Sequence, residues 1–156
     1  MQKPIRVLAG ASLLLMTLGM AQAAGKADVR WIDPDTFSDA GRSVADRDHV
    51  MQALDAHFIR LARQLPDGQT LKLEVTDLDL AGELLPASGR DLRVMRGQAD
   101  WPKMRLRYTL QSEGRALKGG EVRLSDMNYT FATRHDELGY EKRMIERWFK
   151  SEIMAP

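Results

Sequence analysis

The chain has 156 residues, with 23 lysines and arginines against 22 aspartates and glutamates, 44% hydrophobic residues and no cysteine. A nearly neutral chain gives no reason to expect nucleic-acid binding driven by phosphate neutralisation, and the apolar content is too high for a disordered protein. The absence of cysteine excludes disulfides, iron–sulfur clusters, cysteine-based zinc sites, a thiol nucleophile and a lipidated N-terminal cysteine.

The first segment predicts a signal peptide over residues 1–23. Lys3 and Arg6 precede an uncharged apolar run from Val7 to Met20, and Ala21-Gln22-Ala23 supplies the small-x-small pattern that signal peptidase cleaves. The apolar run has about 14 residues, whereas a membrane-spanning helix needs roughly 20. We therefore expect cleavage after Ala23, export by the general secretion route and a periplasmic location.

Cleavage changes the charge of the chain. The leader contains Lys3, Arg6 and no acid, so the remaining 133 residues carry 21 bases and 22 acids, a net charge of −1. We expect residues 24–156 to form a single soluble α+β domain without a further membrane span. Cleavage one residue later, after Ala24, is the alternative.

The first half of this domain predicts a strand, a helix and a second strand. Val29 to Trp31 alternates apolar and polar residues, and an amphipathic helix runs from about Asp48 to Gln64 and ends at a Pro-Asp-Gly turn. Leu71 to Thr76 alternates again, and the alternation slips after Asp77, which predicts a β-bulge near Asp77 or, alternatively, a strand end.

The second half predicts a connection, a hairpin and a final helix. Leu84 to Ala99 contains proline, glycines and several charges and is typical of a long connection. Met104 to Gln111 is the clearest strand, and a return strand follows from about Ala116 to Tyr129, with a bulge or bend at Gly119-Gly120. An amphipathic helix runs from about Glu137 to Met154.

This order predicts a two-layer α+β sandwich, with about four mostly antiparallel strands and two amphipathic helices on one face. The first strand, helix and strand are compatible with a parallel crossover. The opposite sheet face is then polar, mixed in charge and compatible with water. It carries Lys72, Glu74, Thr76, Arg105, Arg107, Thr109 and Gln111.

The acidic segment that begins at Asp77 resembles the first half of a calcium loop. Position five is Ala81 and position twelve is Ser88, where oxygen ligands are required, so an EF-hand is excluded. A looser cation site that uses Asp77 and Asp79, with Asp126 as a further ligand, remains an alternative. The ordinary interpretation is that these acids satisfy backbone donors at a strand end.

No established catalytic motif is present, and we expect no cofactor or metal. The histidines at 49, 57 and 135 lack the helical zinc spacing, and no P-loop, nucleophile elbow or dinucleotide fingerprint occurs. The polar residues at the predicted strand ends and on the last helix form a candidate site for a ligand or a partner. They are Asp77, Asp79, Glu83, Asp126, Asn128 and Arg143.

Five motifs together resemble the bacterial domain-of-unknown-function family 3016. They are Leu65 to Gln69 (LPDGQ), Asp77 to Glu83 (DLDLAGE), Asp100 to Pro102 (DWP), Asp126 to Tyr129 (DMNY) and Tyr140 to Met144 (YEKRM). The resemblance implies a secreted or periplasmic protein. It implies no known activity, substrate or cofactor, so it assigns no functional residues.

The sequence therefore predicts an exported, non-enzymatic binding or interaction domain of the cell envelope. Its contact surface is expected on the polar sheet face or on the acidic segment after Asp77, and its partner is an envelope protein or a small ligand, not nucleic acid. The alternative is a hydrolase or a divalent-cation-binding protein that uses Asp77, Asp79, Glu83 and Asp126.

Overall fold

The computed structural model describes residues 24–87, 90–131 and 137–155, so the predicted signal peptide lies outside the described residues. Within these ranges the strands are β1 (Lys26–Trp31), β2 (Gln69–Asp79), β3 (Glu83–Ala87), β4 (Arg90–Val94), β5 (Lys103–Ser112) and β6 (Arg115–Ser125). The helices are α1 (Val44–Ala62) and α2 (Gly139–Trp148), with short helical turns η1 (Pro34–Thr36), η2 (Tyr129–Phe131) and η3 (Phe149–Ile153). None of the described helices is long and apolar enough to cross a membrane.

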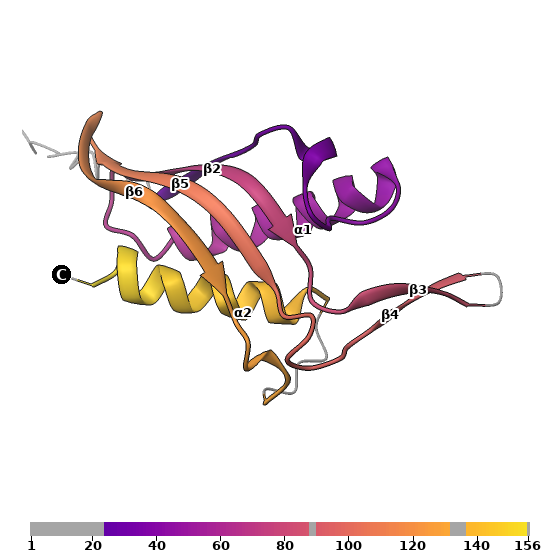
Figure 1. Ribbon diagram of the computed structural model, residues 1–156. Coiled ribbons are helices and arrows are strands. Elements are labelled where there is room, and N and C mark those ends of the chain that lie inside the picture. The colour runs from indigo at the N-terminus through magenta and orange to yellow at the C-terminus, as the bar shows by residue number, and fades with distance from the viewer. Residues whose placement is uncertain (1–23, 88–89, 132–136, 156) are drawn as a thin grey trace, which may run out of the picture.

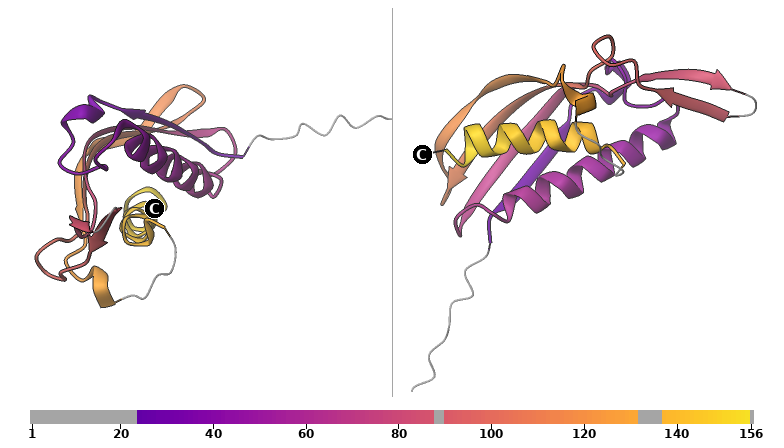
Figure 2. Two further views of the ribbon diagram at one scale, coloured as in Figure 1. Left: turned by 90° about the vertical axis from the view of Figure 1, so that its right-hand side faces the viewer. Right: turned by 90° about the horizontal axis from the view of Figure 1, so that it is seen from below.

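The main sheet has the strand order β1-β2-β5-β6. β1 is parallel to β2, as predicted, because α1 returns the chain to the end of the sheet at which β1 began. The other two pairings are antiparallel. Both helices lie on the same face of this sheet (Figure 1, Figure 2). The predicted α+β class is thereby confirmed.

A second, two-stranded sheet occupies the segment that was predicted to be a connection. β3 pairs antiparallel with β4, and the hairpin extends beyond the end of the main sheet (Figure 1). The prediction of an irregular connection was wrong because apolar residues pair across this hairpin, with Leu85 opposite Leu92. Pro86 is compatible with β3 because a strand with one free edge does not need every backbone donor.

Both helices start at residues other than those predicted. α1 begins at Val44 because Ser43 caps it: the Ser43 hydroxyl accepts a hydrogen bond from the Asp46 amide at 3.0 Å. The Asp46 carboxylate accepts one from the Ser43 amide at 3.2 Å, which completes a capping box. α2 begins at Gly139, and the last turn, η3, is π-helical.

The two predicted bulges had different outcomes. The register of β2 against β5 shifts between Val75 and Asp77, which confirms the first. Gly119 and Gly120 instead pair in regular register with β5, and the irregularity lies at Leu117, which is left out of the pairing. The second prediction was wrong because glycine in a strand marks close backbone approach as well as bulges.

The core lies between the sheet and the two helices. The inward side chains of β2 and β5 alternate with outward polar ones, and α1 and α2 place their apolar stripes against them. Full burial of such a side chain contributes about 1.5–3 kcal/mol by the hydrophobic effect. The completely buried residues include Leu54, Phe58, Leu71, Val75, Leu78, Met104, Leu106, Ile145 and Phe149.

Among the described residues of α1, His57 is the one buried side chain that is polar or charged. It is 1% exposed. A nitrogen of the Arg60 guanidinium lies 2.5 Å from His57 Nδ1, and because arginine only donates, Nδ1 must accept. Burial, followed by the positive charge of Arg60, lowers the pKa of His57 to about 4. The imidazole is therefore neutral in the fold.

This lowered pKa predicts a loss of stability in acid. The unfolded chain protonates His57 near its ordinary pKa of 6.5, whereas the folded chain resists protonation until about 4. The unfolding free energy that depends on the neutral state of His57 is about 3 kcal/mol in all. It is fully present above pH 6.5 and is lost as the pH falls towards 4. His57→Gln should therefore lose less unfolding free energy than wild type between pH 7 and pH 4 in urea titrations. Identical pH profiles for His57→Gln and wild type would contradict the assignment.

Candidate functional site

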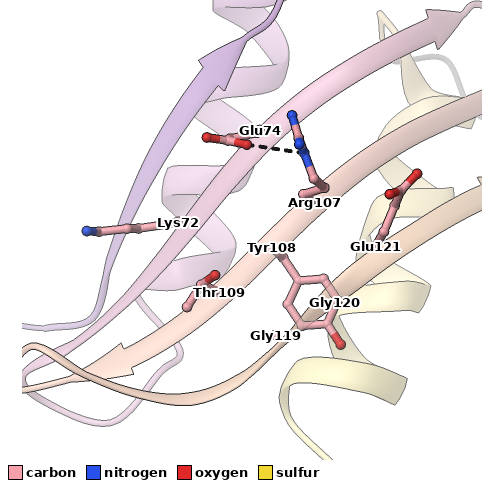
Figure 3. Close-up of a pocket in the computed structure, with 8 residues that line it drawn as sticks. All are labelled: Lys72, Glu74, Arg107, Tyr108, Thr109, Gly119, Gly120 and Glu121. Atoms are coloured by element: carbon pink, nitrogen blue, oxygen red, sulfur yellow. Dashed lines mark ion pairs between the residues drawn. The ribbon is translucent and has the colours of Figure 1, made fainter.

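The face of the main sheet that no helix covers carries charges in rows across the strands. Arg30, Glu74, Arg107 and Glu121 are neighbours on successive strands, and their charges alternate in sign. Glu74 Oε2 lies 3.2 Å from Arg107 Nε (Figure 3). We define the outer face as the surface formed by Arg30, Lys72, Glu74, Arg105, Arg107, Thr109, Glu121 and Arg123.

The outer face is hollowed where β5 and β6 meet. A pocket of about 400 Å³ lies over Tyr108, Gly119 and Gly120, with Lys72 and Glu74 among its lining residues (Figure 3). A Cβ atom on Gly119 would stand 2.9 Å from the Tyr108 carbonyl oxygen, so only glycine fits this strand without displacing its neighbour. Gly119, opposite Thr109, has no side chain on this face, which leaves the hollow.

Tyr108 anchors β5 to the C-terminal turn and has no acid–base role in this pocket. Its hydroxyl donates a hydrogen bond to the Glu152 carboxylate at 2.7 Å, and its ring contacts Trp148 edge to face at 5.4 Å between centroids. Burial and the Glu152 carboxylate raise the pKa of Tyr108 to about 12. The phenol therefore keeps its proton at neutral pH.

Several outer-face charges are unpaired. The side chains of Lys72, Arg105, Glu121 and Arg123 have no ion-pair or hydrogen-bond partner among the described residues. Arg105 lies between Asp77 of β2, whose carboxylate is bonded to Ser38, and Arg123 of β6, so it has a like charge directly opposite on one side. Like charges in directly opposite positions destabilise a sheet. A partner surface of complementary charge would relieve this repulsion.

The predicted acidic residues of β2 and β3 have separate local partners. The Asp77 carboxylate accepts hydrogen bonds from the Ser38 amide at 2.9 Å and from its hydroxyl at 3.2 Å. Asp79 forms an ion pair with Lys103 at 2.7 Å. Glu83 forms an ion pair with Arg96 on the surface. These contacts support the ordinary interpretation, in which such acids satisfy local donors at a strand end.

Asp126, Asn128 and Arg143 are brought together on the other side of the sheet. The buried Asp126 carboxylate accepts hydrogen bonds from Arg143 at 2.5 Å and from Arg147 at 3.0 Å. Arg143 also donates to the main-chain carbonyls of Tyr129 at 3.0 Å and Asn128 at 3.4 Å. This cluster fixes α2 to the end of β6.

The six predicted site residues therefore form two groups and not one pocket. Asp77 and Asp79 alternate with the buried Leu78 and point away from the helices, whereas Asp126 faces α2. Among the residues that the structure describes, no three histidines, aspartates or glutamates are grouped so that they could hold a metal ion.

A second, partly buried cluster was missed from the sequence. Arg93 of β4 donates to Asp39 at 2.7 Å and to the carbonyl of Gly82 at 3.0 Å. Close by, Glu141 of α2 is 3% exposed and accepts a hydrogen bond from the Ala81 amide at 2.8 Å. A charged residue of an amphipathic helix such as Glu141 ordinarily lies on the solvent side. Glu141 is four positions from the buried Ile145 and therefore on the same face of the helix, which was the signal for its burial. The charge of Glu141 concealed that signal.

Burial raises the pKa of Glu141, which gives a second pH-dependent prediction. A carboxyl whose folded pKa exceeds its ordinary value of 4.5 favours folding below that value, and this advantage is lost as the pH rises through the folded pKa. Glu141→Gln keeps an acceptor for the Ala81 amide without a charge. We expect its unfolding free energy, relative to wild type, to be higher at pH 8 than at pH 4. Urea titrations at both values test this, and a relative stability that falls with pH would contradict it.

Four of the five sequence motifs meet at this end of the sheet. The Gly82 amide donates to the Asp100 carbonyl at 2.9 Å, and the Asp126 amide donates to the Pro102 carbonyl at 3.3 Å. The Tyr129 hydroxyl donates to the Asp100 carboxylate at 2.5 Å. With the Glu141 contact, these bonds join β2, β5, β6 and α2. The motifs therefore have an architectural role.

A hollow of about 530 Å³ between the first half of α1, the residues just before α2 and the base of the β3–β4 hairpin is also charged. Its polar groups are paired: Arg93 with Asp39, and His49 with Glu137 at 2.7 Å. The outer face differs because Lys72, Arg105, Glu121 and Arg123 have no such partner within the described part of the chain.

The fold and these contacts define a two-layer α+β protein with one uncovered, charged sheet face and a motif network that is structural. The chain belongs to the family described as protein of unknown function (DUF3016), whose model matches residues 25–151. The resemblance stated from the five motifs is thus confirmed. Neither a curated protein nor a solved structure matches the chain.

Proposed function

We propose that the chain is an exported, non-enzymatic interaction domain of the bacterial cell envelope that binds a protein partner through its outer face. The observation that carries this proposal is the uncovered outer face itself, with its unpaired charges beside a hollow of about 400 Å³. Both helices are on the opposite face (Figure 2). A charged, hydrated face suits a reversible partner better than a permanent one, because permanent interfaces are more apolar.

The export part of the proposal is supported by the leader pattern over residues 1–23. The test is to express the full chain in a bacterium that has a periplasm, fractionate the cells and sequence the N-terminus of the product. We expect a periplasmic product that begins at Ala24. A leader with Ala21→Asp and Ala23→Asp should remain uncleaved. A cytoplasmic product that begins at Met1 would overturn this part.

The binding part is tested by charge reversal on the outer face. Lys72→Glu reverses an exposed, unpaired charge beside the hollow, and Arg63→Glu makes the same change at the end of α1. After crosslinking in cells, proteins specifically recovered with the wild-type chain should fall at least about tenfold for Lys72→Glu and stay unchanged for Arg63→Glu. Equal recovery with both variants would show that another surface binds the partner.

The hydrolase and cation-binding alternatives have no comparable support. Each of Asp77, Asp79 and Asp126 is engaged by a donor or a cation of the chain itself.

A further inference from the structure

The edge of the main sheet formed by β6 is open. β6 is 11 residues long and pairs with β5 on one side, and no described strand lies on its other side. In an antiparallel pair every second residue of an edge strand directs its N–H and C=O away from the neighbour. Gly119 and Gly120 are exposed on this edge and have no side chains that screen the backbone. Another extended chain can therefore reach these groups.

A groove runs beside this edge, between β6 and α2. It has a volume of about 260 Å³, and its apolar part is formed by Leu124, Met144 and Trp148. The indole N–H of Trp148 is buried and has no acceptor within the described part of the chain. Arg147, whose side chain is 58% exposed, lies at the rim. A strand added to β6 would place every second side chain over this apolar part.

We infer that the partner adds an extended segment to the edge of β6 as a fifth strand, antiparallel to it. This inference rests on the proposed function, because it specifies how the partner is bound. The backbone of the added segment satisfies the free donors and acceptors of β6, and the apolar side chains of the segment lie over Leu124 and Trp148. The antiparallel direction is preferred because antiparallel pairing is slightly the more stable. Strand addition of this kind is a general mode of peptide recognition.

The charge rows of the outer face specify the segment further. The alternating row of Arg30, Glu74, Arg107 and Glu121 is continued by a base opposite Glu121. The unpaired Arg123 requires an acid opposite it on the added strand, two positions from that base and on the same face. For an antiparallel segment the order is acid, apolar, base. The partner is thus a strand with one apolar face and an Asp-x-Lys type of pair on the other.

β1, at the opposite edge, serves as an internal comparison. It has six residues against the 11 of β6, and it is an edge strand of the same sheet. Arg30 of β1 is exposed, and its ion pair among the described residues is a 3.9 Å contact with Asp28. A peptide that binds unspecifically to strand edges would bind β1 as well as β6.

The test uses a fluorescein-labelled peptide, Thr-Val-Asp-Val-Lys-Val-Thr, and a second peptide in which Asp and Lys are exchanged. In fluorescence anisotropy with the purified chain, we expect the first peptide to bind at least about tenfold more tightly than the second. The charge-swapped variant Glu121→Arg with Arg123→Glu keeps the net charge and should reverse this preference. Arg30→Glu on β1 should leave it unchanged.

Hydrogen exchange gives an independent readout with the same peptide. Amides of β6 should gain protection in the complex, whereas those of β1 should not. Equal binding of the two peptides, an unchanged preference in the charge-swapped variant, or protection at β1 would each overturn the inference. If these results occur while Lys72→Glu still abolishes recovery of the partner, only strand addition fails and the proposed function stands.

Discussion

Replacing Asp126 by asparagine is expected to lower the free energy of unfolding by about 3–5 kcal/mol. The Asp126 side chain is 2% exposed and is the shared acceptor of Arg143 and Arg147 of α2. Asparagine has nearly the same volume, so packing is preserved while the negative charge is lost. Arg143 is only 19% exposed, and its charge is then left in a poorly solvated position. Removal of one member of a buried pair costs far more than the pair contributes.

Urea unfolding at pH 7, followed by circular dichroism, measures this loss. Glu83→Gln is the matched control, because Glu83 pairs with Arg96 on the surface, with 52% and 51% of the two side chains exposed. Such a pair contributes about 0–1 kcal/mol, so the control should be close to wild type. An Asp126→Asn variant as stable as Glu83→Gln would refute the role of the cluster in holding α2.

Replacing Gly82 by alanine has the second large expected effect, a loss of about 2–5 kcal/mol of unfolding free energy. Gly82 has a φ of 82°, in the left-handed region that strains any residue with a side chain. A Cβ atom there would also lie 2.9 Å from the Val94 carbonyl oxygen and 2.7 Å from Met95 Sδ. The methionine can move, but the carbonyl belongs to the backbone of β4 and cannot move without disturbing the hairpin.

Gly114→Ala separates the two causes. Gly114 has a φ of 79°, and an added Cβ would meet no atom within 4 Å. Its loss, about 1–2 kcal/mol, measures the backbone strain alone. The difference between the two variants in urea unfolding then measures the steric conflict with β4. Equal losses would mean that the contact between Gly82 and the hairpin has no energetic importance.

The fold class was predictable because its main elements carry strong periodicity. The alternation of Met104, Leu106, Tyr108 and Leu110 specified β5 and its buried face, and the phase slip at Asp77 specified the bulge of β2. These signals depend only on which side chains prefer to leave water. The β3–β4 hairpin was not predictable in this way, because it is short and projects from the main sheet, so few of its residues are buried (Figure 1).

The candidate site was less predictable than the fold. Asp126, Asn128 and Arg143 were selected as polar residues at a predicted strand end and on the last helix, and the structure groups them. Asp77 and Asp79 were selected on the same grounds, but the sheet separates them from Asp126. Glu141 was missed because charge normally indicates exposure, and its burial depends on an amide of Ala81 that is 60 positions away in the sequence. Such a long-range contact leaves no local pattern.

The turn between β5 and β6 has a consequence for the order in which the chain folds. Glu113 and Gly114 both have positive φ, at 49° and 79°, as a tight two-residue hairpin turn requires. The chain between β5 and β6 is very short. The whole of α1 separates β1 from its partner β2, and the β3–β4 hairpin separates β2 from its partner β5. Within the main sheet, loop closure therefore costs least for β5 and β6. We expect this hairpin to be formed in the folding transition state, and β1 to dock late.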